Sequence, residues 1–405
     1  MNNLLSEAYL TAERFIIFQN LNRDQNLQKD LLTKEFQNRY LEDWFFKDAN
    51  KEIERLESIE IKEWEDHLHL FQLHRRIYHH PNQNPRMQFG DVIISKMEEQ
   101  NKLVYLLEKA YIINEKIFRK RIIKSEDYDL QKDLKTWREV SNGVNHFSIE
   151  LYRIRFEYTE ENLLENYIFL RKLFLERFEE LSIKEQKVHL YSLINDSSKL
   201  SRARLLDITA SLPLYKIGLK TGIIFNNKKL TQTTYMTIVI ASNVKKDFIF
   251  TDKFIKKYTT YLDHKIQDDA FNWAMAHKTY RMEKLSECLD ILLKHDFKIF
   301  QLQLLTKSLT TQVYFDLHLE NNSYQPFLFN YFDSFEKWLN REKFRSENFK
   351  TGFLKFIQKT RALAKHYSEN DFQSEKVKNL LEGETNVQGS KWLGQRIEKV
   401  LDLKK

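Results

Sequence analysis

The sequence predicts an all-α protein, and three observations predict it. Glycine and proline are scarce, with 8 Gly and 4 Pro in 405 residues, whereas strand-rich and α/β folds need them for turns and loops. Apolar residues recur in steps of three and four, as in Leu103, Leu106, Ala110, Ile113 and Ile117, which places them on one face of a helix. Strict alternation of apolar and polar residues, the pattern of a half-buried strand, is absent over any useful stretch of the sequence.

The same spacing predicts where the helices lie, with short polar connections between them. In the first half of the chain we expect helices over 3–20, 24–41, 43–57, 62–79, 88–122, 127–140, 147–157, 160–180, 183–200 and 204–220. In the second half we expect them over 231–243, 250–263, 266–281, 283–294, 299–319, 324–341, 346–367, 370–382 and 390–402.

Composition predicts a folded, cytoplasmic protein. Hydrophobic residues make up 42% of the chain and aromatic residues 14%, enough for a large core. The single cysteine, Cys288, cannot form an intramolecular disulfide, which favours a reducing compartment. Glu7 and Glu13 interrupt any signal-peptide core, and the most apolar run, Tyr235 to Val244, is too short to cross a bilayer. We therefore expect no membrane span.

One segment carries a recognisable pattern. In Ala270 to Leu293, Tyr280 supplies an aromatic residue to a first helix, Leu285 opens a second helix, and Cys288 and Leu289 follow as a small and an apolar residue. The segment resembles a tetratricopeptide-type helical hairpin. Glu283 stands where such repeats usually have glycine, so the turn must close without a residue that easily adopts a left-handed conformation.

A broader resemblance covers most of the chain, through Leu214 to Leu219, Leu230 to Tyr235, Phe254 to Tyr258, and Lys391 to Leu393. The chain is similar to poorly characterised bacterial families of tetratricopeptide-like helical-repeat proteins. The resemblance implies a right-handed α-solenoid of about eight to ten antiparallel helical hairpins. It carries no catalytic residue across.

Breaks in the helical pattern predict the domain organisation. The run Pro81 to Pro85 interrupts helix on both sides, Gly222 to Lys229 forms a second break, and Gly383 to Gly389 isolates the last helix. We expect an N-terminal hairpin array over 1–222, tetratricopeptide-like hairpins over 223–382, and a terminal capping helix over 383–405.

Histidines and acidic residues suggest a metal site. Five of the twelve histidines lie between His67 and His80, and Glu63, His67 and His74 are one and two helical turns apart. Side chains in such positions can supply zinc ligands. The alternative is that these are ordinary packing positions, which the lack of cysteine partners and of a His-Glu-x-x-His element favours. We expect no metal and no cofactor.

Arg361 and His366 have the Arg-x4-His spacing that resembles the motif of small helical ribonucleases of the HEPN type. Such a pair could bind and protonate a scissile phosphate. The alternative is a basic face on a helix near the C-terminus, because Ala362 replaces the polar residue usual after the arginine.

The net charge of +7 comes from 65 basic and 58 acidic residues, whose signs are interleaved along the chain. This excess of positive charge is mild, and compact nucleic-acid binders usually concentrate their charge more. Most basic clusters lie near expected helix C-termini, where cations are stabilising without a ligand. If they share one face with aromatic residues, however, they could hold nucleic acid. The candidates are Arg119, Lys120, Arg121, Lys124, Arg202, Arg204, Lys256 and Lys257.

Together these observations predict recognition rather than catalysis. A stack of hairpins presents a concave surface that suits an extended peptide or a partner helix. We expect a non-enzymatic adaptor or scaffold for a protein or peptide partner. Nucleic-acid binding and a ribonuclease activity through Arg361 and His366 are the alternatives.

Overall fold

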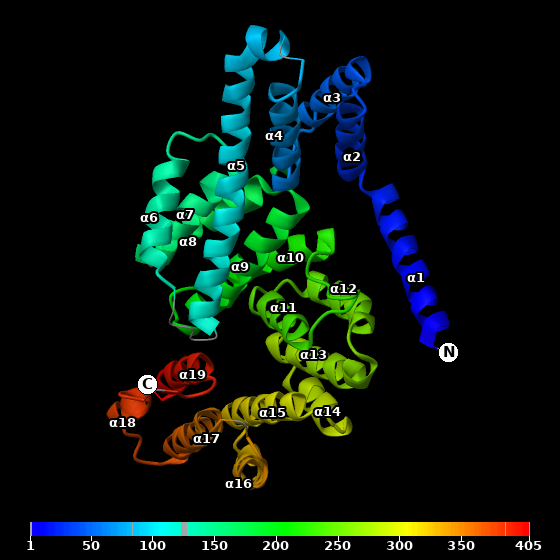
Figure 1. The fold of residues 1–405 in the computed structure, drawn as a ribbon. Coiled ribbons are helices and arrows are strands. Elements are labelled where there is room, and N and C mark those ends of the chain that lie inside the picture. The colour runs from blue at the N-terminus through cyan, green and yellow to red at the C-terminus, as the bar shows by residue number, and fades with distance from the viewer. Residues whose placement is uncertain are drawn as a thin grey trace. The chain divides into compact units, whose positions relative to one another are not determined.

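The computed structural model describes residues 2–82, 84–122, 128–161, 163–344, 346–384 and 386–404. These residues form nineteen α-helices and six short 3-10 helices and contain no strand (Figure 1). The prediction of an all-α protein is confirmed. No helix in these ranges is both long and apolar enough to cross a membrane.

The helices follow one another closely along the chain. The α-helices are α1 (Asn2–Arg23), α2 (Gln25–Asn38), α3 (Glu42–Glu57), α4 (Trp64–Tyr78), α5 (Asn84–Ile122), α6 (Leu130–Ser141), α7 (Phe147–Glu161), α8 (Leu164–Glu176), α9 (Ile183–Arg202), α10 (Leu212–Thr221), α11 (Gln232–Val244), α12 (Phe248–Tyr258), α13 (Gln267–Arg281), α14 (Leu285–Lys294), α15 (Phe300–Glu320), α16 (Gln325–Arg341), α17 (Glu347–Ser368), α18 (Ser374–Lys378) and α19 (Ser390–Leu403). The 3-10 helices are η1 (Phe178–Glu180), η2 (Ile208–Ser211), η3 (Thr259–Tyr261), η4 (His264–Ile266), η5 (Asn322–Tyr324) and η6 (Asn379–Leu381).

The expected helix over 204–220 differs most from the structure at its start, because α10 begins only at Leu212. Arg204 has a left-handed backbone, and the 3-10 helix η2 fills the gap. Pro213 stands in the first turn of α10, where its missing amide hydrogen costs nothing. The expected helix over 370–382 is likewise split into α18 and η6.

The chain divides into two compact units, one up to Asp196 and one from Ser197, so the division falls inside α9. The predicted boundary after residue 222 lies at the end of α10, where Gly222 is a left-handed C-cap.

In the first unit, α4 and α5 pack along each other as an antiparallel pair, and α5 also contacts α6 and α7. Two apolar clusters form its interior, one around Phe45 and Leu73 and the other around Trp137 and Phe156. The Trp137 indole nitrogen donates to the Leu106 carbonyl at 2.9 Å, because a buried indole needs a partner.

Helix α1 differs from the other helices of the first unit in leaving its apolar side chains exposed. Leu5, Tyr9, Phe15, Ile17 and Phe18 all lie on the surface. It contacts α2.

In the second unit, consecutive helices pair as hairpins, with α11 against α12, α13 against α14, and α15 against α16. Helix α13 also contacts the preceding α11 and the following α15. Helix α17 is joined to α15 where the Tyr367 hydroxyl donates to the Leu319 carbonyl at 3.3 Å. One apolar cluster runs from α13 to α19 and includes Phe315, Phe335, Phe356 and Trp392.

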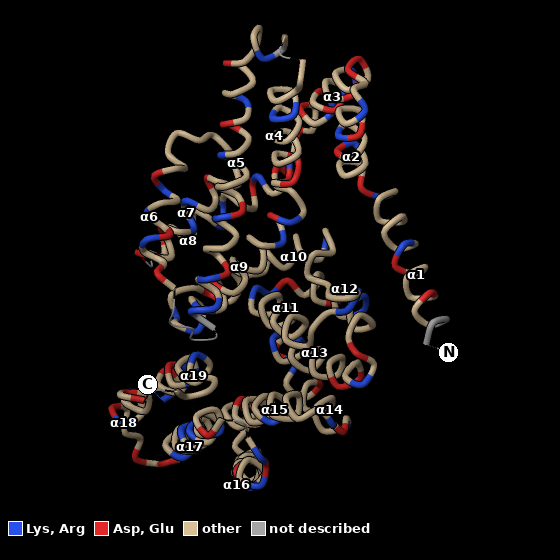
Figure 2. The backbone as a smooth tube through the Cα atoms, viewed as in Figure 1, with Lys and Arg blue, Asp and Glu red and all other residues tan. Residues whose placement is uncertain are grey.

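Basic and acidic residues alternate along most helices of both units (Figure 2). Several of them are ion pairs within one helix, such as Arg39 with Glu35 and Lys294 with Asp290. Pairs of this kind contribute only about 0.3–0.5 kcal/mol each when exposed.

Candidate functional site

The predicted repeat positions lie in the hairpin of α13 and α14. Ala270 and Cys288 are completely buried, Tyr280 and Leu285 are nearly so, and Leu289 packs against the same apolar cluster. The Cys288 thiol donates to the Ala276 carbonyl at 3.1 Å, and burial raises its pKa to about 12. Cys288 is therefore a packing residue, since the reactive form of cysteine is the thiolate.

Glu283 closes the turn of this hairpin with φ at +62°, a conformation that costs a non-glycine residue about 1 kcal/mol. We expect Glu283→Gly to raise the free energy of unfolding by up to about 1 kcal/mol, with part offset by the freer unfolded chain. Glu287→Gly, inside α14, is the control and should lower the free energy of unfolding by about 1 kcal/mol. Urea titrations that show a loss for both variants would contradict this account of the turn.

The most elaborate polar network of the second unit joins α13, α15 and α19. The Tyr280 hydroxyl donates to Asp316 Oδ2 at 2.7 Å, and the Trp392 indole nitrogen donates to the Tyr280 oxygen at 2.6 Å. Arg396 donates twice to Asp316, from Nε to Oδ1 at 2.5 Å and from Nη2 to Oδ2 at 2.7 Å. This two-point geometry is the strongest form of an arginine–carboxylate bond.

Burial sets the electrostatics of this network. Asp316 is 3% exposed and Tyr280 5% exposed. Burial raises the pKa of Tyr280 far above its usual value, and the neighbouring Asp316 charge adds to this effect. Burial opposes the charge of Arg396, but its bonds to Asp316 and Tyr280 outweigh burial and raise its pKa. The carboxylate end of the Arg396–Asp316 ion pair is thus buried, whereas the Arg396 side chain is 21% exposed.

Aromatic side chains form the apolar part of the same site. The Trp392 ring makes edge contacts with Phe315 of α15 and Phe356 of α17, with centroids 5.5 and 5.8 Å apart. Contacts of this geometry are worth about 0.5–1.5 kcal/mol beyond the area they bury. We call the surface formed by Tyr280, Phe315, Asp316 and Phe356 the α19-binding surface.

Gly389 allows α19 to start close to this surface. Its φ is +64°, and a Cβ on it would lie 3.2 Å from the Phe356 ring. We expect Gly389→Ala to lower the free energy of unfolding by about 1–2 kcal/mol from backbone strain alone.

Gly394, one turn into α19, is the matched control for Gly389. A Cβ there would meet no atom within 4 Å, so Gly394→Ala should raise the free energy of unfolding by about 1 kcal/mol through helix propensity. Thermal unfolding of the two variants tests this, and a shift of both midpoints in the same direction would count against the described start of α19.

The candidate metal ligands do not converge. Glu63 caps α4 together with Asp66 and pairs with Lys184 at 2.8 Å. His67 bonds through Nδ1 to Gln100 at 2.7 Å, and burial lowers the pKa of both His67 and His74. Within the described ranges, no three His, Cys, Asp or Glu residues are placed to hold a metal ion.

The structure does not bring Arg361 and His366 together either. Both lie on α17, and five residues turn them about 140° apart around its axis. Arg361 bonds to Asp333 at 2.7 Å and to Glu336 at 3.3 Å on α16. His366 bonds to Glu369 at 2.9 Å. Each side chain thus already has a carboxylate partner.

The candidate nucleic-acid residues lie on separate elements. Arg119 and Lys120 are exposed in the last turn of α5 in the first unit. In the second unit, Arg202 ends α9 and Arg204 donates to Ser390 Oγ at 2.6 Å, while Lys256 and Lys257 are exposed at the end of α12. The side chain of Arg121 and all of Lys124 lie outside the described residues.

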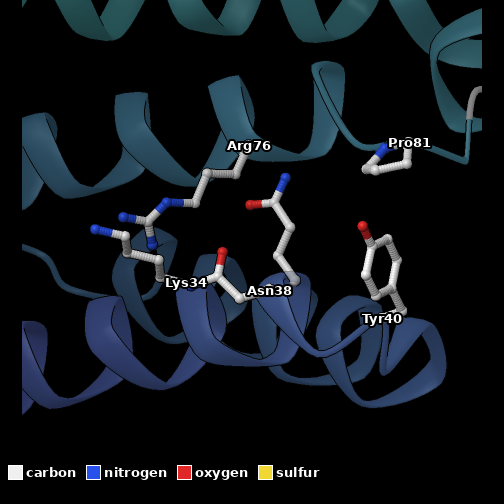
Figure 3. A pocket seen from close by; sticks show the side chains of 6 residues that line it. Lys34, Asn38, Tyr40, Arg76 and Pro81 are labelled. Atoms are coloured by element: carbon white, nitrogen blue, oxygen red, sulfur yellow. The ribbon is translucent and has the colours of Figure 1, made fainter.

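The first unit contains a pocket that the sequence did not predict (Figure 3). It has a volume of about 430 Å³ and is lined by Lys34, Gln37, Asn38, Tyr40, Arg76 and Pro81. Lys34 and Arg76 lie together at one end, and the Tyr40 ring stands at the other. Arg76 is held by Asp30 at 2.7 Å. The helical spacing of Lys34, Gln37 and Asn38 was visible in the sequence, but their proximity to Arg76 was not.

Comparisons with protein-family models, with curated proteins and with solved structures find no match to this chain.

Proposed function

We propose that this chain is a non-enzymatic adaptor that binds a helical segment of a protein partner. The observation that carries the proposal is the α19-binding surface, on which α13, α15 and α17 together hold an amphipathic helix. Amphipathic helices in apolar grooves are a common mode of protein recognition. Aromatic and arginine anchors, such as the buried Trp392 and the partly buried Arg396 here, are the residues that dominate such interfaces.

We further propose that the hairpins form a right-handed tetratricopeptide-like solenoid, as in the bacterial repeat proteins that the sequence resembles. The contacts of α13 with both α11 and α15 support this proposal, because each helical hairpin of a solenoid packs on the hairpins before and after it. In such an array the first helices of successive hairpins line the concave surface. A cytoplasmic location suits the single buried cysteine.

Affinity capture with photocrosslinking tests the adaptor function. A photoreactive residue in place of Gln312 of α15, whose amide lies 3.9 Å from where a Gly389 Cβ would stand, should crosslink a partner protein from native extract. Asp316→Asn should abolish this product, whereas Asp333→Asn, an exposed carboxylate on α16, should leave it unchanged. A crosslinked protein that is insensitive to Asp316→Asn would contradict the proposal.

Nucleic-acid binding is a second candidate, and the pocket of the first unit favours it. Lys34 and Arg76, the latter paired with Asp30, lie at one end of this pocket. Tyr40 lies at the other end, is 79% exposed and could stack on a base. Mobility-shift titrations at two salt concentrations test it, since phosphate contacts weaken steeply with salt. Lys34→Ala should weaken binding, and binding that is unaffected by both salt and Lys34→Ala would exclude this pocket.

A further inference from the structure

Helix α19 does not pack only on the end of the array, as a terminal cap would. Trp392 bonds to Tyr280, 112 residues earlier, and Arg396 bonds to Asp316, 80 residues earlier. At its first turn, Lys391 bonds to Asp207 at 2.5 Å, just before η2. Helix α19 therefore contacts α13 and α15 as well as α17, beside which it lies in Figure 1.

The connection that leads to α19 is irregular. Gly383, Asn386 and Gly389 all have left-handed backbones, and α18 before them has only 5 residues. Asn386 is fastened to Asn348 at 2.8 Å. A short irregular tether of this kind gives α19 a high effective concentration at its surface but no continuous helical connection to α17.

The polar contacts at the start of α19 are exposed and individually weak. Lys391 is 69% exposed and its partner Asp207 is 42% exposed, and such pairs contribute about 0–1 kcal/mol. Burial opposes the charge of Asp207, but bonds to Lys391 and Thr209 outweigh it and hold the pKa at about 2. The contacts that can distinguish one helix from another are therefore those of Trp392 and Arg396, not the Lys391–Asp207 pair.

Those two residues define what the surface recognises. They are four residues apart and so lie on one face of α19, with Leu393, Ile397 and Val400 buried beside them. On the α19-binding surface, the Tyr280 hydroxyl and the Phe356 ring contact Trp392, and the Asp316 carboxylate binds Arg396. The Arg396–Asp316 pair is partly buried, with side chains 21% and 5% exposed, and we expect such a pair to fix the register of one helix against another more than it adds net stability.

We infer that the α19-binding surface is an exchangeable seat for a partner's amphipathic helix, and that α19 occupies this seat until the partner displaces it. The partner helix carries a tryptophan and, four residues later, an arginine, with apolar residues on the same face. This inference rests on the proposed adaptor function and specifies the chemistry of its partner.

A synthetic peptide of residues 387–403 with an N-terminal fluorophore tests the inference on the full-length chain. Trp392→Ala combined with Arg396→Ala in the chain should release α19 from the α19-binding surface. Fluorescence anisotropy should then show that the peptide binds this double variant at least about tenfold more tightly than it binds the unaltered chain. Adding Asp316→Asn to that variant should reverse the gain. Lys399→Ala, an exposed cation of the same helix, is the matched control and should bind like the unaltered chain.

Peptide variants test the chemistry of the partner. Replacing the tryptophan or the arginine of the peptide with alanine should each weaken binding at least about tenfold, while the Lys399→Ala peptide should bind like the original. Circular dichroism verifies folding, and Arg396→Ala alone takes the place of the double variant if the latter unfolds. The inference is overturned if a folded, emptied chain does not bind the peptide, or binds all peptides equally. If the peptide binds but no Asp316-dependent crosslink forms in extract, the α19-binding surface can still exchange its helix. That result would refute only the proposed adaptor function.

Discussion

Asp316→Ala is expected to lower the free energy of unfolding of the second unit by about 1–3 kcal/mol. The substitution leaves the Arg396 guanidinium, which is 21% exposed, without its carboxylate, and the Tyr280 hydroxyl loses its acceptor. Arg281 adds to the loss, because burial and, more weakly, the Arg396 charge lower its pKa, and the substitution removes the Asp316 charge that opposes both. Urea titration followed by circular dichroism and tryptophan fluorescence measures the change.

A double replacement separates the contribution of the unpaired Arg396 charge to the free energy of unfolding from the contribution of side-chain packing. Asp316→Leu with Arg396→Met removes both charges and keeps most of the volume, so it should be close to neutral. Asp333→Ala removes an exposed partner of Arg361 and should cost less than about 1 kcal/mol. A loss below about 1 kcal/mol for Asp316→Ala would mean that Arg396 finds water or another partner, and it would contradict the described network.

Acid is expected to destabilise the first unit as the pH falls from about 6.5 toward 5, the range in which unperturbed histidines take up a proton. Burial lowers the pKa of His67, His69 and His74, so the folded state keeps these rings neutral where the unfolded chain protonates them. The unfolded state then binds more protons, and stability falls as the pH falls from about 6.5 toward the folded pKa values. Each ring contributes at most about 1.4 kcal/mol per pH unit over that range.

The neighbours of these histidines do not reverse the effect. Glu52 lies 3.5 Å from His69 and favours its charged form, but burial is the larger influence on that pKa. For His74, burial and the Lys96 charge both favour the neutral ring, against weaker opposition from Glu57 and Glu99.

Chemical denaturation at several pH values measures this dependence. His74→Leu should reduce the slope of unfolding free energy against pH by up to about 1.4 kcal/mol per unit, and His79→Gln, exposed at the end of α4, should not change it. Equal stability of the first unit at pH 7 and pH 5 would contradict the assignment of neutral buried rings.

Much of the helical structure was predictable from local signals. The three- and four-residue spacing that places Leu106, Ala110 and Ile113 on one face is a property of the sequence alone, and those residues are buried in α5. The predicted helices were wrong where the chain forms a 3-10 helix instead of an α-helix. The segment before Leu212 forms η2 instead of a first part of α10. Phe178–Glu180 form the 3-10 helix η1 instead of the end of an α-helix.

The candidate site was not predictable, because its partners are distant in the chain. Asp316 and Arg396 are 80 residues apart, and a charged residue on a helix is usually solvent-exposed. One signal was present: Asp316 stands between Phe315 and Leu317 on a helix that is otherwise nearly free of acidic residues until Glu320. At the α13–α14 turn the sequence showed that no glycine was present to adopt a left-handed conformation, and the structure places Glu283 itself in that conformation.

Hydrogen exchange of the full-length chain tests the central claim most directly. If the α13, α15 and α17 surface is an exchangeable seat, the amides of α19 should exchange through local opening, much faster than those of α15. Arg396→Ala should speed the exchange of α19 further and leave α11 and α12 unchanged. Exchange of α19 at the same rate as α15, in both the unaltered chain and Arg396→Ala, would show that α19 leaves its surface only when the whole unit unfolds and would contradict the account.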